Sequence, residues 1–322
     1  MTTPAPSRNG PPAAAPLGIG TAHAKTILIG EHAVVYGAPA IALPVHGLRA
    51  RAELHAGHLW SLDCDLHHGT VHDAPTTVAP VITAWQQAVG QLASTRATGR
   101  LVVTSDIPMQ RGLGSSAAVA AAVVDAVASA SGVSLGLPER IELVQQAEMI
   151  AHGKASGIDT AAVLSEVPIL FEQGAISPVA VGGRFVFVVA DTGVTGSTAR
   201  AVGGVRSLRE AQPGLVNGLV DGLSELSRVV VHCLQQGDLD TLGAAMNDAH
   251  EALNRLGVGA DVLDHLVSAA RRAGALGAKL TGGGLGGCIV ALSRAEDVDR
   301  LQYELQRAGS HGNWTTTLEG PA

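Results

Sequence analysis

A short glycine- and serine-rich segment carries the residues best suited to chemistry in this chain. Its sequence is Gly112-Leu-Gly-Ser-Ser116, and it leads directly into an alanine-rich run at residues 117–124. Glycine at positions 112 and 114 lets the backbone approach a ligand closely, while the two serines stand where a helix would begin. The first amides of a helix have no partner within the helix and lie at the positive end of its dipole, so they bind anions. The segment predicts the phosphate loop of a nucleotide site, although these five residues alone equally fit an ordinary loop with a good helix cap.

Ionisable side chains elsewhere in the chain could complete such a site. Lys25 precedes an apolar run, and Glu31-His32 occupies the turn that follows this run. Glu148 and Asp159 lie eleven residues apart, on either side of a glycine-serine loop. Each of these residues, considered alone, also fits a solvated strand end, a helix cap or a turn.

Histidines gather between residues 55 and 72, where a metal site could be suspected. The candidate ligands are His55, His58, Cys64, Asp65, His67, His68 and His72. Their spacing matches no compact zinc pattern, so we interpret this segment as a solvated hairpin.

The expected elements place the glycine-serine loop between a strand and a helix. Residues 99–105 alternate apolar and polar side chains as a strand does, and this order of strand, loop and helix is the one that a phosphate loop requires. Neither the Walker A pattern nor Gly-x-Gly-x-x-Gly occurs there. A second glycine-rich turn, residues 282–287, is followed by a strand at 288–292 instead of a helix, which argues against a dinucleotide fingerprint.

The length of 322 residues suits two domains of ordinary size. Residues 1–16, with five prolines and no apolar run, predict a flexible tail. A buried strand at 184–190 precedes a change to long amphipathic helices, so we expect domains at 17–185 and 186–318. The other expected elements are strands within 17–37, 38–45, 48–72 and 314–318, and helices at 76–95, 138–153, 213–236, 238–256, 261–274 and 296–308.

Composition excludes several classes of protein. No apolar run approaches the ~20 residues that span a bilayer, and a net charge of −7 without clustered Lys and Arg argues against nucleic-acid binding. Cys64, Cys233 and Cys288 are odd in number and far apart, which favours reduced thiols. We therefore expect a soluble, cytoplasmic protein with no membrane or nucleic-acid partner, and the sequence allows for a homodimer.

Three separated segments resemble, in order and spacing, the motifs of the GHMP kinases, a family that includes galactokinase, homoserine kinase, mevalonate kinase and phosphomevalonate kinase. The segments are Lys25–Gly37, Pro108–Ala118 and Lys279–Gly287, and the resemblance covers about residues 17–318. The middle motif, Pro-x-x-x-Gly-Leu-Gly-Ser-Ser-Ala-Ala, is specific to this family. The resemblance implies an α+β fold of two domains: an N-terminal mixed β/α domain with a left-handed β-α-β phosphate-loop unit, and a C-terminal ferredoxin-like α/β domain.

Within the family, the first motif, Ile-Gly-Glu31-His32-Ala-Val-Val-Tyr-Gly, is similar to that of the mevalonate kinases. This similarity implies ATP and mevalonate as substrates, Mg²⁺ as the metal, and phosphorylation of the C5 hydroxyl in isoprenoid biosynthesis. One alternative is another kinase of the family, such as phosphomevalonate kinase, whose phosphorylated substrate calls for a cluster of extra Lys or Arg. We see no such cluster near Glu31 or Thr198. The other is a non-catalytic ligand sensor on the same scaffold.

The same resemblance implies the roles of individual residues. Asp159 would accept the proton of the substrate hydroxyl or orient that hydroxyl, with Lys25 beside it, and Ser116 and Glu148 would hold Mg²⁺. The residues expected to contact ATP are Lys25, Ser105, Gln110, Arg111, Gly112, Leu113, Gly114, Ser115 and Ser116. The residues expected to bind the substrate are Lys25, Glu31, His32, Asp159 and Thr198. Adenine contacts are expected in the hairpin at 53–73.

Two positions depart from the family pattern. His23-Ala24 replaces the more usual Pro-Gly before the lysine, and Gln110-Arg111 stands where many relatives have smaller residues. We expect the Arg111 side chain either to add charge near the phosphates or to point to solvent, and the loop backbone to carry the binding.

Overall fold

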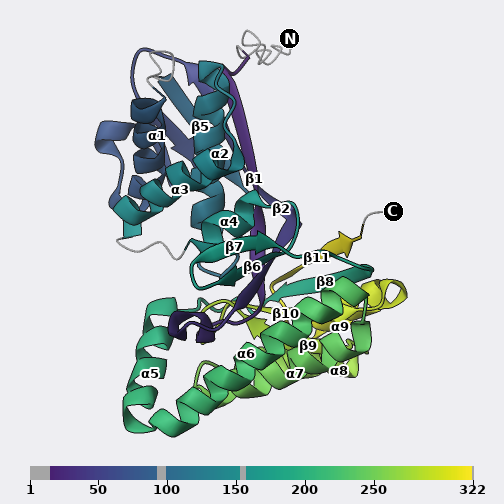
Figure 1. Cartoon of the computed structure of the whole chain (residues 1–322). Coiled ribbons are helices and arrows are strands. Elements are labelled where there is room, and N and C mark those ends of the chain that lie inside the picture. The colour runs from purple at the N-terminus through teal and green to yellow at the C-terminus, as the bar shows by residue number, and fades with distance from the viewer. Residues whose placement is uncertain (1–14, 93–98, 153–156, 321–322) are drawn as a thin grey trace, which may run out of the picture.

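Two β-sheets, each with its own helices, make up the chain (Figure 1). The computed structural model describes residues 15–92, 99–152 and 157–320. Within these residues the first sheet contains β1 (Gly18–Ile29), β2 (Ala40–Ala56), β3 (Ser61–Cys64), β4 (His67–Thr70), β5 (Gly99–Ser105), β6 (Ile169–Glu172) and β7 (Ala175–Pro178). The second sheet contains β8 (Arg184–Asp191), β9 (Gly277–Thr281), β10 (Cys288–Ser293) and β11 (Gly312–Glu319). The helices are α1 (Ala79–Gln91), α2 (Ser115–Ser131), α3 (Leu137–His152), α4 (Ile158–Leu164), α5 (Thr198–Ala211), α6 (Pro213–Gln236), α7 (Leu239–Arg255), α8 (Asp261–Arg272) and α9 (Val298–Arg307).

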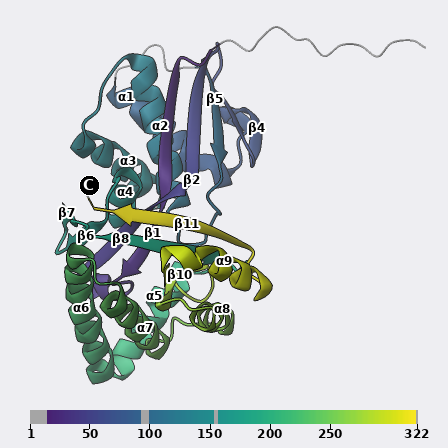
Figure 2. The same cartoon turned by 90° about the vertical axis from the view of Figure 1, so that its right-hand side faces the viewer.

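The first sheet has the strand order β4-β3-β5-β2-β6-β7, and β1 pairs with β2 as an additional strand. Helices α1, α2 and α3 lie on one face of this sheet (Figure 2). His23 pairs with Arg49, whereas the next residue, Ala24, pairs with Val45. The register between β1 and β2 therefore shifts after His23. Residues 46–48 of β2 therefore form a bulge.

The second sheet is antiparallel, with the order β11-β8-β10-β9. Along the chain, β8 is followed by helices, then by β9 and β10, then by α9 and β11. This is the β-α-β-β-α-β arrangement of a ferredoxin-like sheet. The expected two-part α+β fold with a ferredoxin-like C-terminal part is confirmed.

Helix α2 packs unusually close to β1, because both present small residues to each other. A Cβ atom added to Gly20 would lie 2.0 Å from the carbonyl oxygen of Ala122, and one added to Gly18 would lie 2.1 Å from that of Ala126. No side chain fits at either position. With aromatic residues at only 2% of the chain, contacts of this kind replace bulky side chains in the core.

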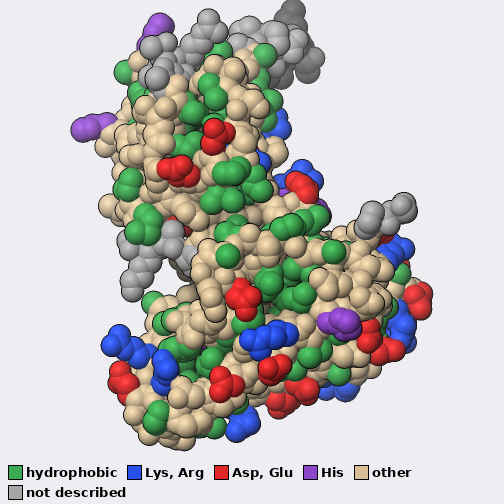
Figure 3. Space-filling model, viewed as in Figure 1, with side chains coloured by type: hydrophobic (Ala, Val, Ile, Leu, Met, Phe, Trp, Pro, Cys, Tyr) green, Lys and Arg blue, Asp and Glu red, His purple; other side chains and the backbone are tan. Residues whose placement is uncertain are grey.

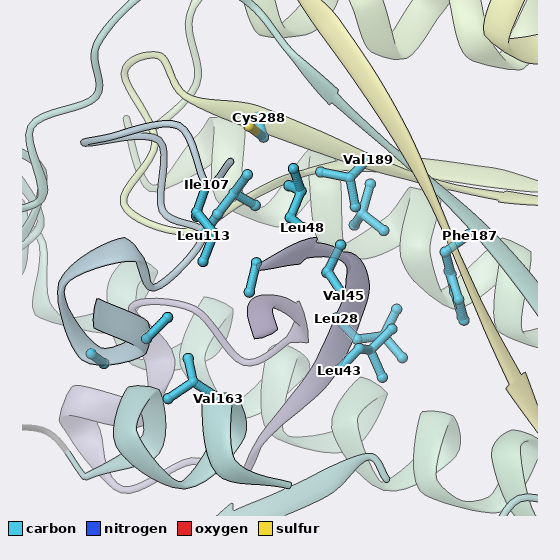
Figure 4. Packing of buried hydrophobic residues seen from close by; sticks show 14 of the residues in the cluster. Leu28, Leu43, Val45, Leu48, Ile107, Leu113, Val163, Phe187, Val189 and Cys288 are labelled. Atoms are coloured by element: carbon cyan, nitrogen blue, oxygen red, sulfur yellow. The ribbon is translucent and has the colours of Figure 1, made fainter. Parts of the chain in front are cut away.

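One hydrophobic core continues from the first sheet into the second (Figure 4). Leu113, from the glycine-serine segment, is buried in the same cluster as Leu28 and Val45 of the first sheet. Phe187 and Val189 of β8 belong to it as well. The two sheets are therefore packed against each other, and the glycine-serine segment is anchored where they meet.

Most expected elements are present, and several need correction. Residues 30–37 form a turn and a short 3₁₀ helix (Ala33–Tyr36) instead of a second strand, because Gly30 turns the chain with a φ of 100°. Strands β6 and β7 and helices α4 and α5 were not expected from the sequence. Gly203 and Gly204 lie in the middle of α5 and weaken its helical signal. Most of the expected tail, and Gly153 as the end of α3, lie outside the described residues.

In the described ranges, none of the helices combines the length and the apolar content needed to cross a lipid bilayer.

Candidate active site

Residues 25–27 of β1, which belong to the first motif, form hydrogen bonds with both the second and the third motif. The Lys25 backbone N–H donates a hydrogen bond to the carbonyl oxygen of Leu113, at 3.0 Å. Thr281, at the end of β9, accepts a hydrogen bond from the Ile27 N–H at 3.0 Å and donates one to the Ile27 carbonyl at 2.9 Å. Its hydroxyl also lies 2.9 Å from that of Thr26. The three motifs, which are spread over residues 25–287 of the sequence, therefore meet at one place.

The glycine-serine segment forms a loop whose backbone is in close contact on both sides. Gly112 has a φ of 80°, and a Cβ atom added there would lie 3.2 Å from Gly282 Cα in the third motif. Gly114 has a φ of 73° and stands at the N-cap of α2, where an added Cβ would lie 2.8 Å from Lys25 Cγ. Both positions require a residue that adopts positive φ and has no side chain. The start of α2 is thus open to an anion.

Four of the expected polar residues lie in two pairs beside this loop. Lys25 Nζ lies 2.8 Å from Asp159 Oδ1, with side-chain exposures of 4% and 46%. Ser116 donates a hydrogen bond to Glu148 Oε1, at 2.6 Å. Asp159 stands in the first turn of α4, Ser116 in the first turn of α2 and Glu148 in the last turns of α3. The structure therefore brings these four residues to the start of α2.

A mainly apolar cavity of about 460 Å³ opens on one side of the loop. We call it the first cavity. Ser105, Gln110, Ser115 and Ser116 line it from the loop region. The remaining lining residues are Cys64, Asp65, Leu66, Thr77, Val78, Pro80, Val81, Val103, Asp106, Ile107, Pro108, Met109, Val119 and Ala120. The turn between β3 and β4 thus contributes to this cavity, in the hairpin where we expected adenine contacts.

A more polar cavity of about 590 Å³, the second cavity, lies on the other side of the loop. It is lined by Gln110, Arg111, Gly112, Thr195, Gly196, Ser197, Thr198, Ala199, Arg200, Gly283, Gly284, Gly286 and Gly287. Both sheets contribute to it, and the surface is indented between the helices of the first sheet and α5 (Figure 3). Gln110 lines both cavities, so the loop separates them.

Of the residues expected to bind the substrate, Thr198 lines the second cavity, whereas Lys25, His32 and Asp159 do not. Glu31 does not line it either. Its carboxylate forms a buried ion pair with Lys279, and the two side chains are 2% and 0% exposed. Burial raises the pKa of Glu31 and lowers the pKa of Lys279, while their pairing opposes both shifts. His32 is also buried, and its Nε2 donates to the carbonyl of Gly283 at 3.0 Å. Glu31 and His32 therefore hold the third motif in place.

The Arg111 side chain lines the second cavity beside the phosphate loop and is paired with a carboxylate. It lies 2.9 Å from a carboxylate oxygen of Asp191, which is buried at the end of β8, and it donates to the carbonyl of Gly193 at 3.0 Å. This ion pair connects the phosphate loop to the second sheet. No sequence signal links residues 111 and 191.

The histidines of the hairpin have separate partners. His55 contacts Glu53, His67 contacts the carbonyl of Thr70, and His68 contacts Asp63. In the part of the chain that the structure describes, they do not form a group of three donors close enough for one metal ion. A metal site in the hairpin is not supported.

The fold and the loop are those of a family of small-molecule kinases. The family model for the GHMP kinases N terminal domain matches residues 78–166, and the model for the GHMP kinases C terminal domain matches residues 230–311. The chain belongs to the GHMP kinase family.

Several proteins similar to this chain are mevalonate kinases. The chain is 34% identical to the mevalonate kinase of Pyrococcus horikoshii over 85% of its own length and 88% of the relative's. It is 32% identical to the mevalonate kinase of Aeropyrum pernix, over 87% of its own length and 90% of the relative's. Among solved structures, L. major mevalonate kinase in complex with R-mevalonate matches with a TM-score of 0.83 and 28% identity, over 95% of this chain and 97% of that one.

Replacing Thr281 by valine should loosen the junction of the motifs. Thr281→Val keeps the shape of the side chain but leaves the N–H and C=O of Ile27 without their partner, so we expect a loss of about 2 kcal/mol or more in the free energy of unfolding. Urea denaturation followed by circular dichroism measures this. Thr104→Val on β5, where the side chain is exposed, is the matched control and should change stability by less than about 0.5 kcal/mol. Equal stability of the two variants would contradict the role given to Thr281.

Proposed function

We propose that this protein is an ATP-dependent mevalonate kinase that phosphorylates the C5 hydroxyl of mevalonate. The observation that carries the proposal is the placement of the Lys25–Asp159 and Ser116–Glu148 pairs at the start of α2, next to the phosphate loop. Phosphoryl transfer depends mainly on alignment and on neutralisation of charge, and these pairs supply both. The mevalonate kinase relatives support the choice of acceptor.

ATP would bind along the loop, with its phosphates on the backbone amides at the start of α2 and its nucleoside in the first cavity. The positive φ of Gly112 and Gly114 lets the loop turn without side chains between its backbone and the phosphates. Ser105 accepts a hydrogen bond from the Ile107 N–H at 3.2 Å and lines the first cavity, so it can contact both the loop and the nucleotide.

Ser116 and Glu148 would hold Mg²⁺. A hydroxyl and a carboxylate oxygen 2.6 Å apart form a hard oxygen donor set, which suits Mg²⁺ when phosphate oxygens and waters complete the shell. When bound, the ion would neutralise charge on the phosphates. The site thus needs no Walker B aspartate.

Asp159 would accept the proton of the C5 hydroxyl, or orient that hydroxyl for in-line attack. Its carboxylate is half-exposed, so a substrate can reach it, while the Lys25 ammonium that it contacts is almost completely buried. The buried cation stabilises negative charge that develops on the attacking oxygen.

The acceptor would enter the second cavity. Arg200, in the first turn of α5, is an exposed lining residue, and sequence analysis did not single it out. A guanidinium binds a carboxylate through two parallel hydrogen bonds, so Arg200 suits the carboxylate of mevalonate, with Thr198 beside it. The other arginine of this cavity, Arg111, is engaged by Asp191. Among the described residues that line this cavity, Arg200 is the one cation that is not paired with a carboxylate, and a phosphorylated acceptor would call for more.

We also infer that the protein works in the cytoplasm, in isoprenoid biosynthesis. Its three cysteines, Cys64, Cys233 and Cys288, are free thiols, which suits a reducing compartment. A homodimer stays a prediction.

The acceptor and the role of Asp159 can be tested in one assay. ADP release should be rapid with mevalonate and slow with phosphomevalonate, galactose or homoserine offered in parallel. Asp159→Asn keeps the shape of the side chain and removes its charge, so kcat with mevalonate should fall by about 10²- to 10⁴-fold. ATP binding, measured by calorimetry, should change little. Unchanged turnover in this variant would rule out the role of Asp159, and a preference of the wild type for another acceptor would rule out the proposed substrate.

Loss of the carboxylate at position 148 should weaken the response to Mg²⁺. Glu148→Gln should raise the Mg²⁺ concentration for half-maximal activity by about tenfold or more, because a neutral amide binds the ion less well. Glu142→Gln, at an exposed position of the same helix, is the control and should leave this concentration unchanged. If both variants respond to Mg²⁺ as the wild type does, Glu148 is not a ligand.

Removal of the guanidinium at position 200 should affect substrate binding more than turnover. Arg200→Gln should raise KM for mevalonate by about 10- to 100-fold, because loss of a hydrogen bond to a charged group weakens binding by about this factor. The change in kcat should be smaller. Arg206→Gln on the same helix, where the side chain pairs with Glu210 in solvent, is the matched control. A KM that is the same in both variants would remove Arg200 from the acceptor site.

A further inference from the structure

A group of three potential metal ligands lies at the bulge between β1 and β2, apart from both cavities. It consists of His23 on β1, His46 in the bulge of β2 and Glu166, which follows α4. One ligand atom from each residue lies within 4.8 Å of the other two. His23 is the residue that departs from the family pattern before Lys25, and the kinase reaction described above makes no use of it.

The hydrogen bonds of His23 leave one ring nitrogen ready to bind a metal. Its Nδ1 lies 2.8 Å from the carbonyl oxygen of Ala24, which can only accept, so Nδ1 carries the proton. In the neutral ring Nε2 then presents a lone pair, and this buried atom makes no hydrogen bond of normal distance and angle among the described residues. The side chain is only 5% exposed, and burial lowers its pKa, which keeps the ring neutral. The Ser165 backbone still acts on the ring and raises its pKa, but burial outweighs this effect. A histidine whose other nitrogen donates to a backbone carbonyl is the usual arrangement at metal sites.

The other two residues complete a donor set. His46 Nδ1 lies 3.6 Å from Glu166 Oε2, and the two imidazole rings are 4.8 Å apart, edge to face. Donors around a tetrahedral Zn²⁺ are about 3.3 Å apart, so the group must contract slightly to hold an ion. Glu166 can move to allow this, because its side chain is 81% exposed.

We infer that His23, His46 and Glu166 form a binding site for a divalent transition metal ion such as Zn²⁺. Two imidazoles and one carboxylate are a donor set that Zn²⁺ accepts, with water in the fourth position, whereas Mg²⁺ prefers oxygen ligands only. The site therefore differs in metal preference from the Ser116–Glu148 pair, which offers oxygen ligands only.

The ion would connect the two segments that carry Lys25 and Asp159. His23 stands two residues before Lys25, and α4 begins next to Asp159 and ends two residues before Glu166. A bound ion would therefore brace the bulge of the first sheet against α4. Because it binds the folded chain and not the unfolded one, it should stabilise the protein.

The test measures Zn²⁺ binding to the full-length protein in excess Mg²⁺, which occupies sites made of oxygen ligands. Calorimetry should give one Zn²⁺ per chain, and Zn²⁺ should raise the melting temperature. Glu166→Gln and His46→Gln alter exposed or half-exposed side chains, so both should fold and should bind Zn²⁺ at least about tenfold more weakly. His68→Gln, in the hairpin, is the control and should bind as the wild type does. Co²⁺ in place of Zn²⁺ should give the visible absorption of a four- or five-coordinate ion with nitrogen ligands.

Three results would overturn the inference. The first is no Zn²⁺ binding by the wild type, and the second is wild-type affinity in both Glu166→Gln and His46→Gln. The third is a loss of binding in His68→Gln that equals the loss in those two variants. Melting temperatures of all variants without metal show whether a loss of binding reflects misfolding, and His23→Gln is interpreted only if its melting temperature is retained.

Discussion

The backbone of β1 between Lys25 and Ile27 is the constraint on which the rest of the site depends. Its hydrogen bonds to Leu113 and Thr281 fix the phosphate loop and the third motif relative to the same three residues. Because these bonds involve main-chain groups that are buried, they cannot be exchanged for water without cost. The Lys25 side chain then projects from a position that is already set. Positioning of this precision is what phosphoryl transfer requires, since it uses little covalent chemistry from the protein.

The buried pair of Glu31 and Lys279 has a structural part in this arrangement. Two charges that are withdrawn from water gain little net stability from each other, but loss of one partner leaves the other charge unpaired at a high cost. The main effect of the pair is therefore to fix the position of the third motif relative to the first. Its contribution to overall stability is small. His32 extends the same connection through its bond to Gly283, whose backbone lines the second cavity. The shape of that cavity thus depends on residues that are buried behind it.

Local sequence signals predicted the parts of the fold that local physics decides. The phosphate loop needed only glycines, serines and a following alanine run, and α6, with its long amphipathic face and final glycine, was predicted with its observed bounds. The resemblance to the family supplied Lys25, Ser116, Glu148 and Asp159, which the fold brings together. What could not be predicted depends on distant partners: the burial of Glu31 by Lys279, the pairing of Arg111 with Asp191, and the approach of Arg200 to the loop. Helix α5 was missed because its two central glycines disfavour a helix, and packing in the folded chain overrides this preference.

The phosphate loop is held from both sheets, and this decides how two substrates can meet. Arg111 ties the loop to Asp191, and Gly112 touches Gly282, so the loop cannot move independently of the second sheet. The two cavities share Gln110 but no other lining residue. A nucleotide and an acceptor bound in them, as proposed above, would approach the loop from its two sides. Because the loop is held from both sheets, it fixes the two cavities relative to each other, which favours alignment of the two substrates.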